Sequence, residues 1–470
     1  MSGILHGPGP DPLAQADREW IGAGSLVTDV ASTHPSRVPW WIAFLVALGL
    51  VGLLVASVAW LLWEGVGVWG NNVPVTWALD IVGYDWWIGV ATGSMAISAL
   101  MLLSGVEWRG AVNRMAETTA LLAVAAAGLY PIIHLGRPWF FYWNLPYPNT
   151  FLLWPQFRSP LYWDAIDIVS FLGIALLTWF TGLIPDLASM RDRAVEAMQR
   201  GEGREGAFTR RLKARLYGIT SLGWRGSVVH WQRWEHASRI MATFGLVLVV
   251  SLQTGAAVMF AGSVEPGWHD AMLPISYLFG AVFAGVGIVG AMLVVVRAVF
   301  PLRPLITPRH FAYLAGMLLA LAVINLYCYA ASFGFTALVG NGFEHGVLGR
   351  RFDGPHAWAT WAIIVCSLIP PHIFWFPPAR RSGLLLAVVG VLVAFGVWAD
   401  HFMVIVDTLQ HDFLPSSAHP YAMNLVAVAT FLGTVGLFLF LVLLFLRYIP
   451  VASIFGLSRM MHPAEVARRG

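Results

Sequence analysis

The chain of 470 residues is 58% hydrophobic and only 11% charged, with a mean hydropathy of +0.70. Water-soluble domains carry about 25% charged residues, so this composition excludes a chain that covers itself with a polar surface and predicts a polytopic membrane protein. The formal net charge of +3 is too small to indicate binding of nucleic acid.

Ten segments are long and apolar enough to span a membrane, which takes roughly 20 apolar residues each. The N-terminal segment 1–38 lacks the pattern of a secretory signal and is expected to be a soluble tail. Alternation typical of β-barrel strands does not occur, so we predict an all-α fold. The expected helices lie near 39–63, 85–106, 112–134, 162–184, 237–262, 271–298, 309–336, 356–377, 383–407 and 421–447.

A weak internal repeat predicts how these helices are grouped. FRSPLYWDAID, before the fourth helix, and RRFDGPHAWATW, before the eighth, both carry arginine, then proline, then tryptophan three residues later. The two motifs are four helices apart, and an even number of helices preserves orientation. Unless the repeat arises by chance, it predicts two parallel four-helix bundles. The expected domains are a tail (1–38), a peripheral helix (39–63), the two bundles (85–262 and 271–407), a second peripheral helix (421–447) and a C-terminal tail (448–470).

Arginine is concentrated in alternate loops, which predicts the orientation in the membrane. These loops fall on the cytoplasmic side if the N terminus is cytoplasmic, and an even number of helices then places both termini there. We therefore expect a multi-pass protein of the bacterial cytoplasmic (inner) membrane. The long polar loop 185–235 includes a stretch, 191–217, that suits either a cationic amphipathic helix on anionic lipid headgroups or a solvated loop against a neighbouring protein.

The cysteine pattern limits the cofactors of the chain. Cys328 and Cys366 lie in apolar runs, and the sequence has neither a CxxCH motif nor a cysteine cluster. We therefore expect no haem and no iron–sulfur centre to be bound by this chain, so any such centre belongs to another subunit.

The strongest candidate site lies between the third and fourth helices. His134 ends the third helix, and Ser159 and Pro160 have the character of an N-cap and a first helical residue. Asp164 follows one turn into the fourth helix. Because a short loop joins these antiparallel neighbours, we expect His134 and Asp164 to approach each other near the outer surface.

Ionisable groups at membrane depth are costly and therefore indicate a functional site. A neutral histidine suits a first proton acceptor and a carboxylate a second, so the pair predicts a pocket for a quinol. Each residue also has a simpler interpretation, such as helix capping, binding of lipid phosphate or an aromatic belt. The expected pocket residues beside the pair are Arg137, Trp139, Phe140, Arg158, Asp85 and Asp167.

Three further groups are candidates for a proton relay. Asp400 and His401 are adjacent within the ninth helix, where an ion pair or a relay is expected. Glu117 falls near an inner helix end, where a lipid-facing or capping role is the stronger interpretation.

The run from Arg114 to Asp164, RMAETTALLAVAAAGLYPIIHLGRPWFFYWNLPYPNTFLLWPQFRSPLYWD, resembles the NrfD-like, polysulfide-reductase type of quinone-interacting membrane subunits. WGNNVPVTWALDI, GLIPDLASMRDRA, FWFPPARRS and DTLQHDFLPSS extend the resemblance over most of the chain. Within the family, the chain looks most similar to the ActC subunits of bacterial alternative complex III.

The resemblance implies a ten-helix, quinol-oxidising subunit with menaquinol as the favoured substrate and a pocket on the outer face that uses His134 and Asp164. It also implies partners: an iron–sulfur subunit of the molybdopterin-oxidoreductase type on the outer face, haem-c subunits and a second NrfD-like membrane subunit, within surrounding lipid. The chain would be inactive alone.

This sequence departs from the family pattern at positions that bear on proton transfer. Thr92 stands where a histidine is expected, and Asp400-His401 replaces a Glu-Arg pair. These changes put proton translocation in doubt more than quinol oxidation. The alternatives are a structural or proton-conducting NrfD-type subunit without a quinol site and a secondary transporter, which would need broken helices that meet at the midplane.

Overall fold

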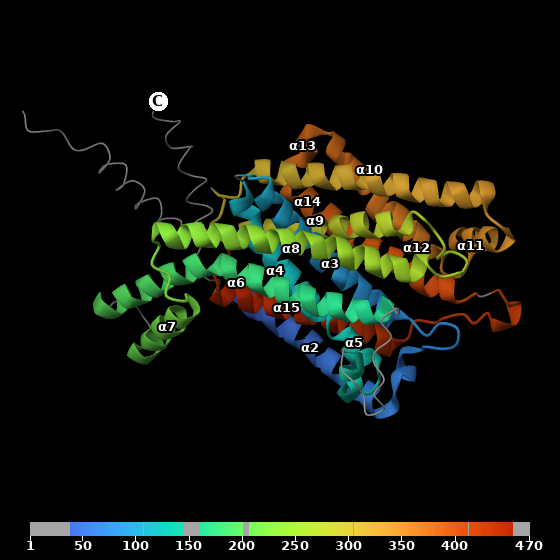
Figure 1. Cartoon of the computed structure of the whole chain (residues 1–470), viewed down its shortest axis with the longest axis horizontal. Helices are drawn as coiled ribbons and strands as arrows, with labels where there is room; N and C mark the ends of the chain where they lie inside the picture. Colours follow the sequence, from blue (N-terminus) through green and yellow to red (C-terminus); the bar gives the residue numbers. More distant parts are fainter. Residues whose placement is uncertain are drawn as a thin grey trace, which may run out of the picture.

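The computed structural model describes residues 38–106, 108–144, 160–200, 206–303, 305–411 and 413–454. These residues form helices and no strand, and ten helical segments are long and apolar enough to cross a membrane. The predictions of an all-α fold and of ten spanning segments are therefore confirmed. The long helices lie side by side along the long axis of the molecule (Figure 1).

The spanning segments alternate in direction along the chain. The first is α2 (Val38–Glu64), followed by α3 (Leu79–Leu103), α4 (Arg109–Ala127) with its short extension α5 (Tyr130–His134), and α6 (Pro160–Arg200). The remaining elements are α7 (Ala207–Thr220), α8 (Val228–Ala261), α9 (Leu273–Val299), α10 (Pro308–Val339), α11 (Gly342–Asp353), α12 (Ala357–Ala362), α13 (Pro377–Arg380), α14 (Gly383–Phe402) and α15 (Leu425–Tyr448).

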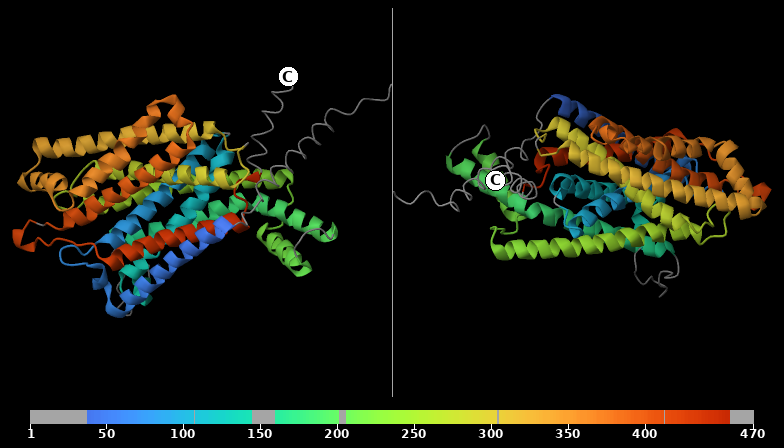
Figure 2. Two further views of the ribbon diagram at one scale, coloured as in Figure 1. Left: turned by 180° about the vertical axis from the view of Figure 1, so that it is seen from behind. Right: turned by 90° about the horizontal axis from the view of Figure 1, so that it is seen from above.

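Helix α3 lies at the centre of the molecule. In its most apolar stretch 83% of the residues are buried, against 17% in α2. It packs against α4, α8, α9 and α14, while α2 and α15 pair at the periphery and reach the rest through α15 (Figure 2). Polar side chains on α3 are consequently enclosed by protein. The division into two bundle domains stays a prediction.

Glycines bring α3, α9 and α14 into close contact. A Cβ atom on Gly93 of α3 would lie 2.0 Å from the carbonyl oxygen of Ala281, and one on Gly285 of α9 would lie 2.4 Å from the backbone of Gly93. Gly287 and Gly390 face each other in the same way between α9 and α14. Small residues permit such backbone approach between membrane helices, where packing drives association.

The polar loop predicted over 185–235 is largely helical. Helix α6 continues through Pro185 to Arg200, and α7 packs against it. The stretch 191–217 is therefore not one separate helix, since its first ten residues prolong α6. Helix α7 does carry a row of exposed apolar side chains along one side: Phe208, Leu212, Leu216 and Ile219.

Two spanning segments contain π-helical turns. The eighth passes from α12 into a π-helix, η3 (Ile363–Leu368), and then into a 3₁₀-helix, η4 (Pro370–Trp375). The ninth ends in a π-helix, η5 (Met403–Asp407). Such turns are rare in proteins but are often found at functional sites, and η5 begins just after Asp400 and His401.

Candidate functional site

The predicted site lies at the end of the bundle where α3 and α6 begin and α5 ends (Figure 1). His134 is the last residue of α5, and Asp164 lies one turn into α6, which begins at Pro160 as predicted. Ser159, the predicted N-cap, is outside the described residues. Two α3 residues, Asp80 and Tyr84, complete the site.

His134 forms a hydrogen bond with Asp80. Its Nδ1 atom contacts Oδ2 of Asp80, whose side chain is 1% exposed, whereas the imidazole is 28% exposed. Oδ1 of Asp80 accepts a hydrogen bond from the backbone N–H of Ala78 at 3.2 Å. The carboxylate is thus held by the first turn of α3, and Nε2 of the partly exposed imidazole has no hydrogen bond to another described residue. A carboxylate on Nδ1 fixes the tautomer and ring orientation of a histidine.

Asp164 is held by Tyr84. The phenol O–H lies 3.0 Å from one carboxylate oxygen and 2.9 Å from the other. Tyr84 is 7% exposed, so its hydroxyl is aimed at Asp164 from within the core. The tyrosine therefore fixes the direction in which Asp164 leaves α6.

Helix α3 links the two proton-accepting candidates. Asp80 and Tyr84 are four residues apart, so they share one face of α3 and lie about 6 Å apart along its axis. His134 and Asp164 are thus brought to one helix face at neighbouring levels, each with its own α3 partner. Each side chain hydrogen-bonds to α3 and not to the other member of the pair.

The HLGRPW turn needs its glycine. Gly136 has φ of +67°, a left-handed conformation that side chains rarely adopt. A Cβ atom there would also lie 2.9 Å from Cγ1 of Val66. The chain turns here, and Arg137, Trp139 and Phe140 come just after the turn. The side chains of Trp139 and Phe140 are at least 40% exposed. Arg158 lies outside the described residues.

The other predicted pocket residues have different neighbours. Asp167 accepts a hydrogen bond from Ser251 of α8 at 3.1 Å. Asp85 is 3% exposed, and its Oδ2 atom is 3.4 Å from Nδ1 of His401 on α14. Because successive residues of a helix are turned by about 100°, Tyr84 faces α6 while Asp85 faces the second half of the chain.

The ion pair or relay expected at Asp400 and His401 stays a prediction, and His401 also lies close to Asp85, with Nδ1 3.4 Å from Oδ2 of that carboxyl group. His401 is 3% exposed and packs edge-on against Tyr277 of α9, with ring centroids 5.1 Å apart. Asp400 points elsewhere and lines a narrow cleft together with Tyr329 of α10. The two neighbouring side chains therefore belong to different polar groups.

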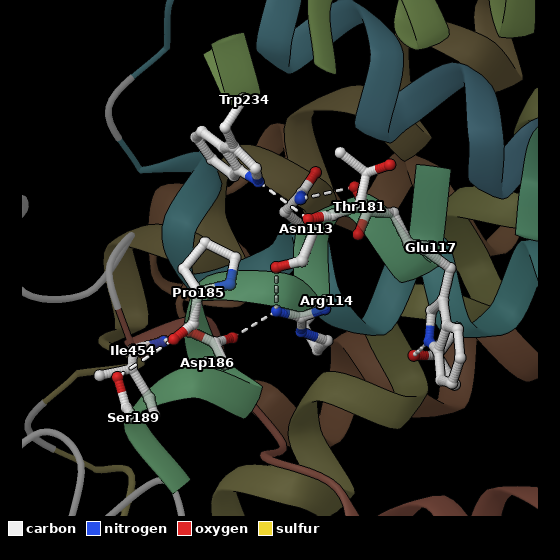
Figure 3. A network of polar contacts seen from close by, with 12 residues as sticks. Asn113, Arg114, Glu117, Thr181, Pro185, Asp186, Ser189, Trp234 and Ile454 are labelled. Atoms are coloured by element: carbon white, nitrogen blue, oxygen red, sulfur yellow. Dashed lines mark hydrogen bonds and ion pairs between the residues drawn. The ribbon is translucent and has the colours of Figure 1, made fainter. Parts of the chain in front are cut away.

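Glu117 lies inside the bundle, in the middle of α4 (Figure 3), and His134 lies beyond the end of that helix. It is 5% exposed, so the lipid-facing or capping interpretation is wrong. Its Oε1 atom accepts hydrogen bonds from Asn113 Nδ2 at 2.8 Å and Ser98 Oγ at 3.2 Å, while Oε2 is buried without a hydrogen-bond partner. A cavity of about 20 Å³ beside it has room for one water molecule.

A buried ion pair lies next to Glu117, on the same face of α4. Arg114 pairs with Asp186 and donates to the carbonyl oxygen of Gly182 at 2.9 Å (Figure 3). Asp186 also accepts from the backbone N–H of Ile454 at 3.1 Å. The pair therefore joins α4, α6 and the segment that follows α15.

The position of the unusual Thr92 is polar but satisfied. Thr92 is fully buried on α3, accepts a hydrogen bond from Gln253 Nε2 at 2.8 Å and donates to the carbonyl of Ile88 at 2.8 Å. The residues that sequence reasoning missed are Asp80, Tyr84 and Tyr277. Asp80 and Tyr84 are four residues apart, a spacing that places them on one helix face. This could not be recognised because the predicted helix began at Asp85.

Comparisons with known proteins identify the family of the chain. A family model described as "Polysulphide reductase, NrfD" matches residues 67–411, which is more than half of the chain. The chain is also 21% identical, over 444 residues, to the C subunit of the selenate reductase of Mesobacillus selenatarsenatis (strain DSM 18680 / JCM 14380 / FERM P-15431 / SF-1). That match covers 90% of this chain and 95% of the relative.

Proposed function

Because the chain belongs to the NrfD polysulphide reductase family, we propose that it is the quinol-oxidising membrane subunit of a quinol:electron-acceptor oxidoreductase. The observation that supports this best is the hydrogen bond between Asp80 and Nδ1 of His134, which leaves Nε2 available beside a second carboxylate at one helix face. The presence of a reductase subunit among the relatives agrees with an electron-transfer complex.

The reaction follows from the placement of these groups. Oxidation of one quinol breaks two O–H bonds and releases two protons and two electrons. Nε2 of His134 accepts the proton of one hydroxyl, and Asp80 stabilises the imidazolium that forms. Asp164, held by Tyr84, accepts the other proton, and both electrons leave for an iron–sulfur centre of a partner subunit.

The finer assignments rest on the sequence resemblance. The ring enters from the lipid beside Trp139 and Phe140, on the outer face of the cytoplasmic membrane, with both termini in the cytoplasm. The substrate is menaquinol, and the complex is of the alternative complex III type, with a molybdopterin-oxidoreductase-like iron–sulfur subunit, haem-c subunits and a second NrfD-like subunit.

The test is quinol:acceptor turnover by the whole complex carrying His134→Ala or Asp164→Asn. Loss of a general base lowers turnover by about 10²- to 10⁴-fold, so each variant should fall by that order. His236→Ala, which changes an exposed histidine of α8, should leave the rate unchanged. Near-normal rates in both site variants, with the complex assembled, would reject the proposal.

A proton-conducting role without quinol chemistry is the second candidate. Two observations favour it: the buried Oε2 atom of Glu117 has no hydrogen-bond partner, and Asp85 pairs with His401 inside the bundle. Buried ionisable groups in membrane helices mark proton pathways. This candidate predicts proton transfer that persists in the two site variants, whereas quinol oxidation coupled to transfer predicts that both are lost together.

A further inference from the structure

A second cavity, separate from the His134 site, lies in the other half of the chain. It has a volume of about 340 Å³ and is enclosed by the loop before α9, the last turns of α10 and the face of α11. Helix α11 lies at the same end of the bundle as α5 (Figure 1). Pockets for small molecules measure about 300–1,000 Å³, so the cavity is large enough for a ligand headgroup.

Arg351 of α11 places a buried positive charge on its wall. The residue is 8% exposed, and its Nη2 atom donates to the carbonyl oxygen of Gly267 at 3.1 Å. Its Nε atom is buried without a hydrogen-bond partner, and the ion pairs found among the described residues do not include it. Burial lowers the pKa of Arg351, and the carboxylates of Asp407, Asp400 and Asp270, none within ion-pair distance, offset this only in part. Arg351 can therefore pair directly with an anion that enters the cavity.

Two carboxylates line the same cavity. Asp270 pairs with Ser332 of α10 and accepts from the backbone N–H of Met272 at 2.8 Å. Glu344 accepts from the backbone N–H of Asn341 at 2.8 Å. These bonds hold both side chains in place and leave acceptor sites on each carboxylate, because an ionised carboxylate has about four. The cavity thus offers a fixed cation site beside its anion site.

The third wall is apolar and reaches the end of a membrane span. The span formed by α10 ends at Val339, and the exposed fractions of Phe335, Leu338 and Val339 are 64%, 83% and 79%. Phe335 and Val339 line the cavity together with Leu348. Such side chains indicate contact with lipid, so the cavity lies where the hydrocarbon layer meets the headgroups.

We propose that this cavity binds one phospholipid with a primary ammonium headgroup, of the phosphatidylethanolamine type. Arg351 holds the phosphate, Asp270 and Glu344 accept hydrogen bonds from the ammonium, and the acyl chains leave over Phe335 and Val339. An anionic glycerol headgroup lacks the cation for the carboxylates. A choline headgroup has no N–H to donate, and an uncharged quinone ring supplies no anion for Arg351.

The test uses the assembled complex in detergent, stripped of lipid and supplied with phosphatidylethanolamine, phosphatidylcholine or phosphatidylglycerol. Bound lipid is counted by native mass spectrometry. The wild type should retain one phosphatidylethanolamine with a preference over the other two of at least about tenfold, which is about 1.4 kcal/mol. Equal retention of all three lipids would overturn the proposal.

Variants separate the two charge contacts. Arg351→Gln should abolish the retained lipid, whereas Arg350→Gln, next along α11 and not on the cavity wall, should not. Glu344→Gln keeps a side chain able to cap α11 and should reduce only the preference for ethanolamine over choline. Unchanged retention and preference in both cavity variants would contradict the assignment.

Competition with a water-soluble analogue distinguishes a lipid from a free phosphate compound. Glycerophosphoethanolamine carries the same charges without acyl chains. It should displace the lipid only at far higher concentration, because burial of each CH₂ adds about 0.8 kcal/mol. Displacement at a concentration equal to that of the lipid would show that the site binds a soluble ligand and would overturn the lipid assignment.

Discussion

Asp80 and His134 are 54 positions apart in the chain, yet the Asp80 carboxylate holds Nδ1 of the imidazole. The carboxylate itself is anchored to the first turn of α3 by the N–H of Ala78. A base at a helix end, exposed on one side, thus has a buried partner that sets its orientation.

Asp80→Asn should disable this base while leaving the ring in place. An amide N–H on residue 80 donates to Nδ1, so the proton of the neutral imidazole moves to Nε2, which can no longer accept one. We expect quinol turnover to fall about as far as loss of the base itself, by about 10²- to 10⁴-fold, with little change in KM. The check is steady-state turnover of the complex with Asp192→Asn, an exposed carboxylate on α6, as control. A rate within twofold of wild type would show that Asp80 does not act through His134.

Tyr84→Phe should free Asp164 from its fixed direction. A buried acceptor that loses its donor costs about 1–3 kcal/mol, so about a 5- to 150-fold loss of turnover is expected. Because the hydrogen bond favours the ionised carboxylate, its loss should also move the acidic limb of the pH–rate profile upward. Tyr448→Phe, an exposed tyrosine at the end of α15, is the matched control. An unshifted acidic limb would contradict a role for Tyr84 at Asp164.

Much of the fold could be predicted from the sequence because length and apolarity alone identify spanning helices. The start of α3 could not: Asp80 and Asp85 interrupt the apolar run, and both are tolerated only because other helices bury them. Helix α6 was expected to end near Pro185, but it continues through that proline to Arg200, where it packs against α7.

The candidate site could be predicted only in part. The positions of His134 and Asp164 at neighbouring helix ends follow from chain order and the opposite directions of successive spans, although the connection from His134 to Pro160 is longer than the short loop that was expected. Their partners do not, because Asp80 and Tyr84 come from a third helix whose rotation is set by tertiary packing. The pairing of His401 with Asp85 likewise depends on how α3 lies against α14.

Gly93→Ala should destabilise the centre of the molecule. The added Cβ would lie 2.0 Å from the Ala281 carbonyl, and backbone atoms cannot give way as a side-chain end can. Overpacking costs typically 1–3 kcal/mol, so the thermal unfolding temperature of the purified complex should fall by several degrees. Gly173→Ala on α6, where a Cβ has nothing within 4 Å, should leave it unchanged. Equal unfolding temperatures would contradict the close approach of α3 and α9.

Glu117→Gln tests whether the inner carboxyl group carries protons. The amide keeps an oxygen for Asn113 and Ser98 but cannot titrate, so quinol oxidation should continue while proton transfer across the membrane is lost. The measurement is the number of protons moved per electron pair in proteoliposomes of the whole complex. Glu235→Gln, an exposed carboxylate on α8, serves as control. An unchanged ratio would exclude Glu117 from a proton pathway.

Helix α6 has a mechanical consequence. Its 41 residues make a rod about 60 Å long, whereas a bilayer with its headgroups is about 40–45 Å thick. One tip carries Asp164, and the other projects beyond the lipid with α7 folded against it. Because the helix is continuous, a protein that binds the projecting end and tilts it would also move the Asp164 carboxylate on the far side of the membrane.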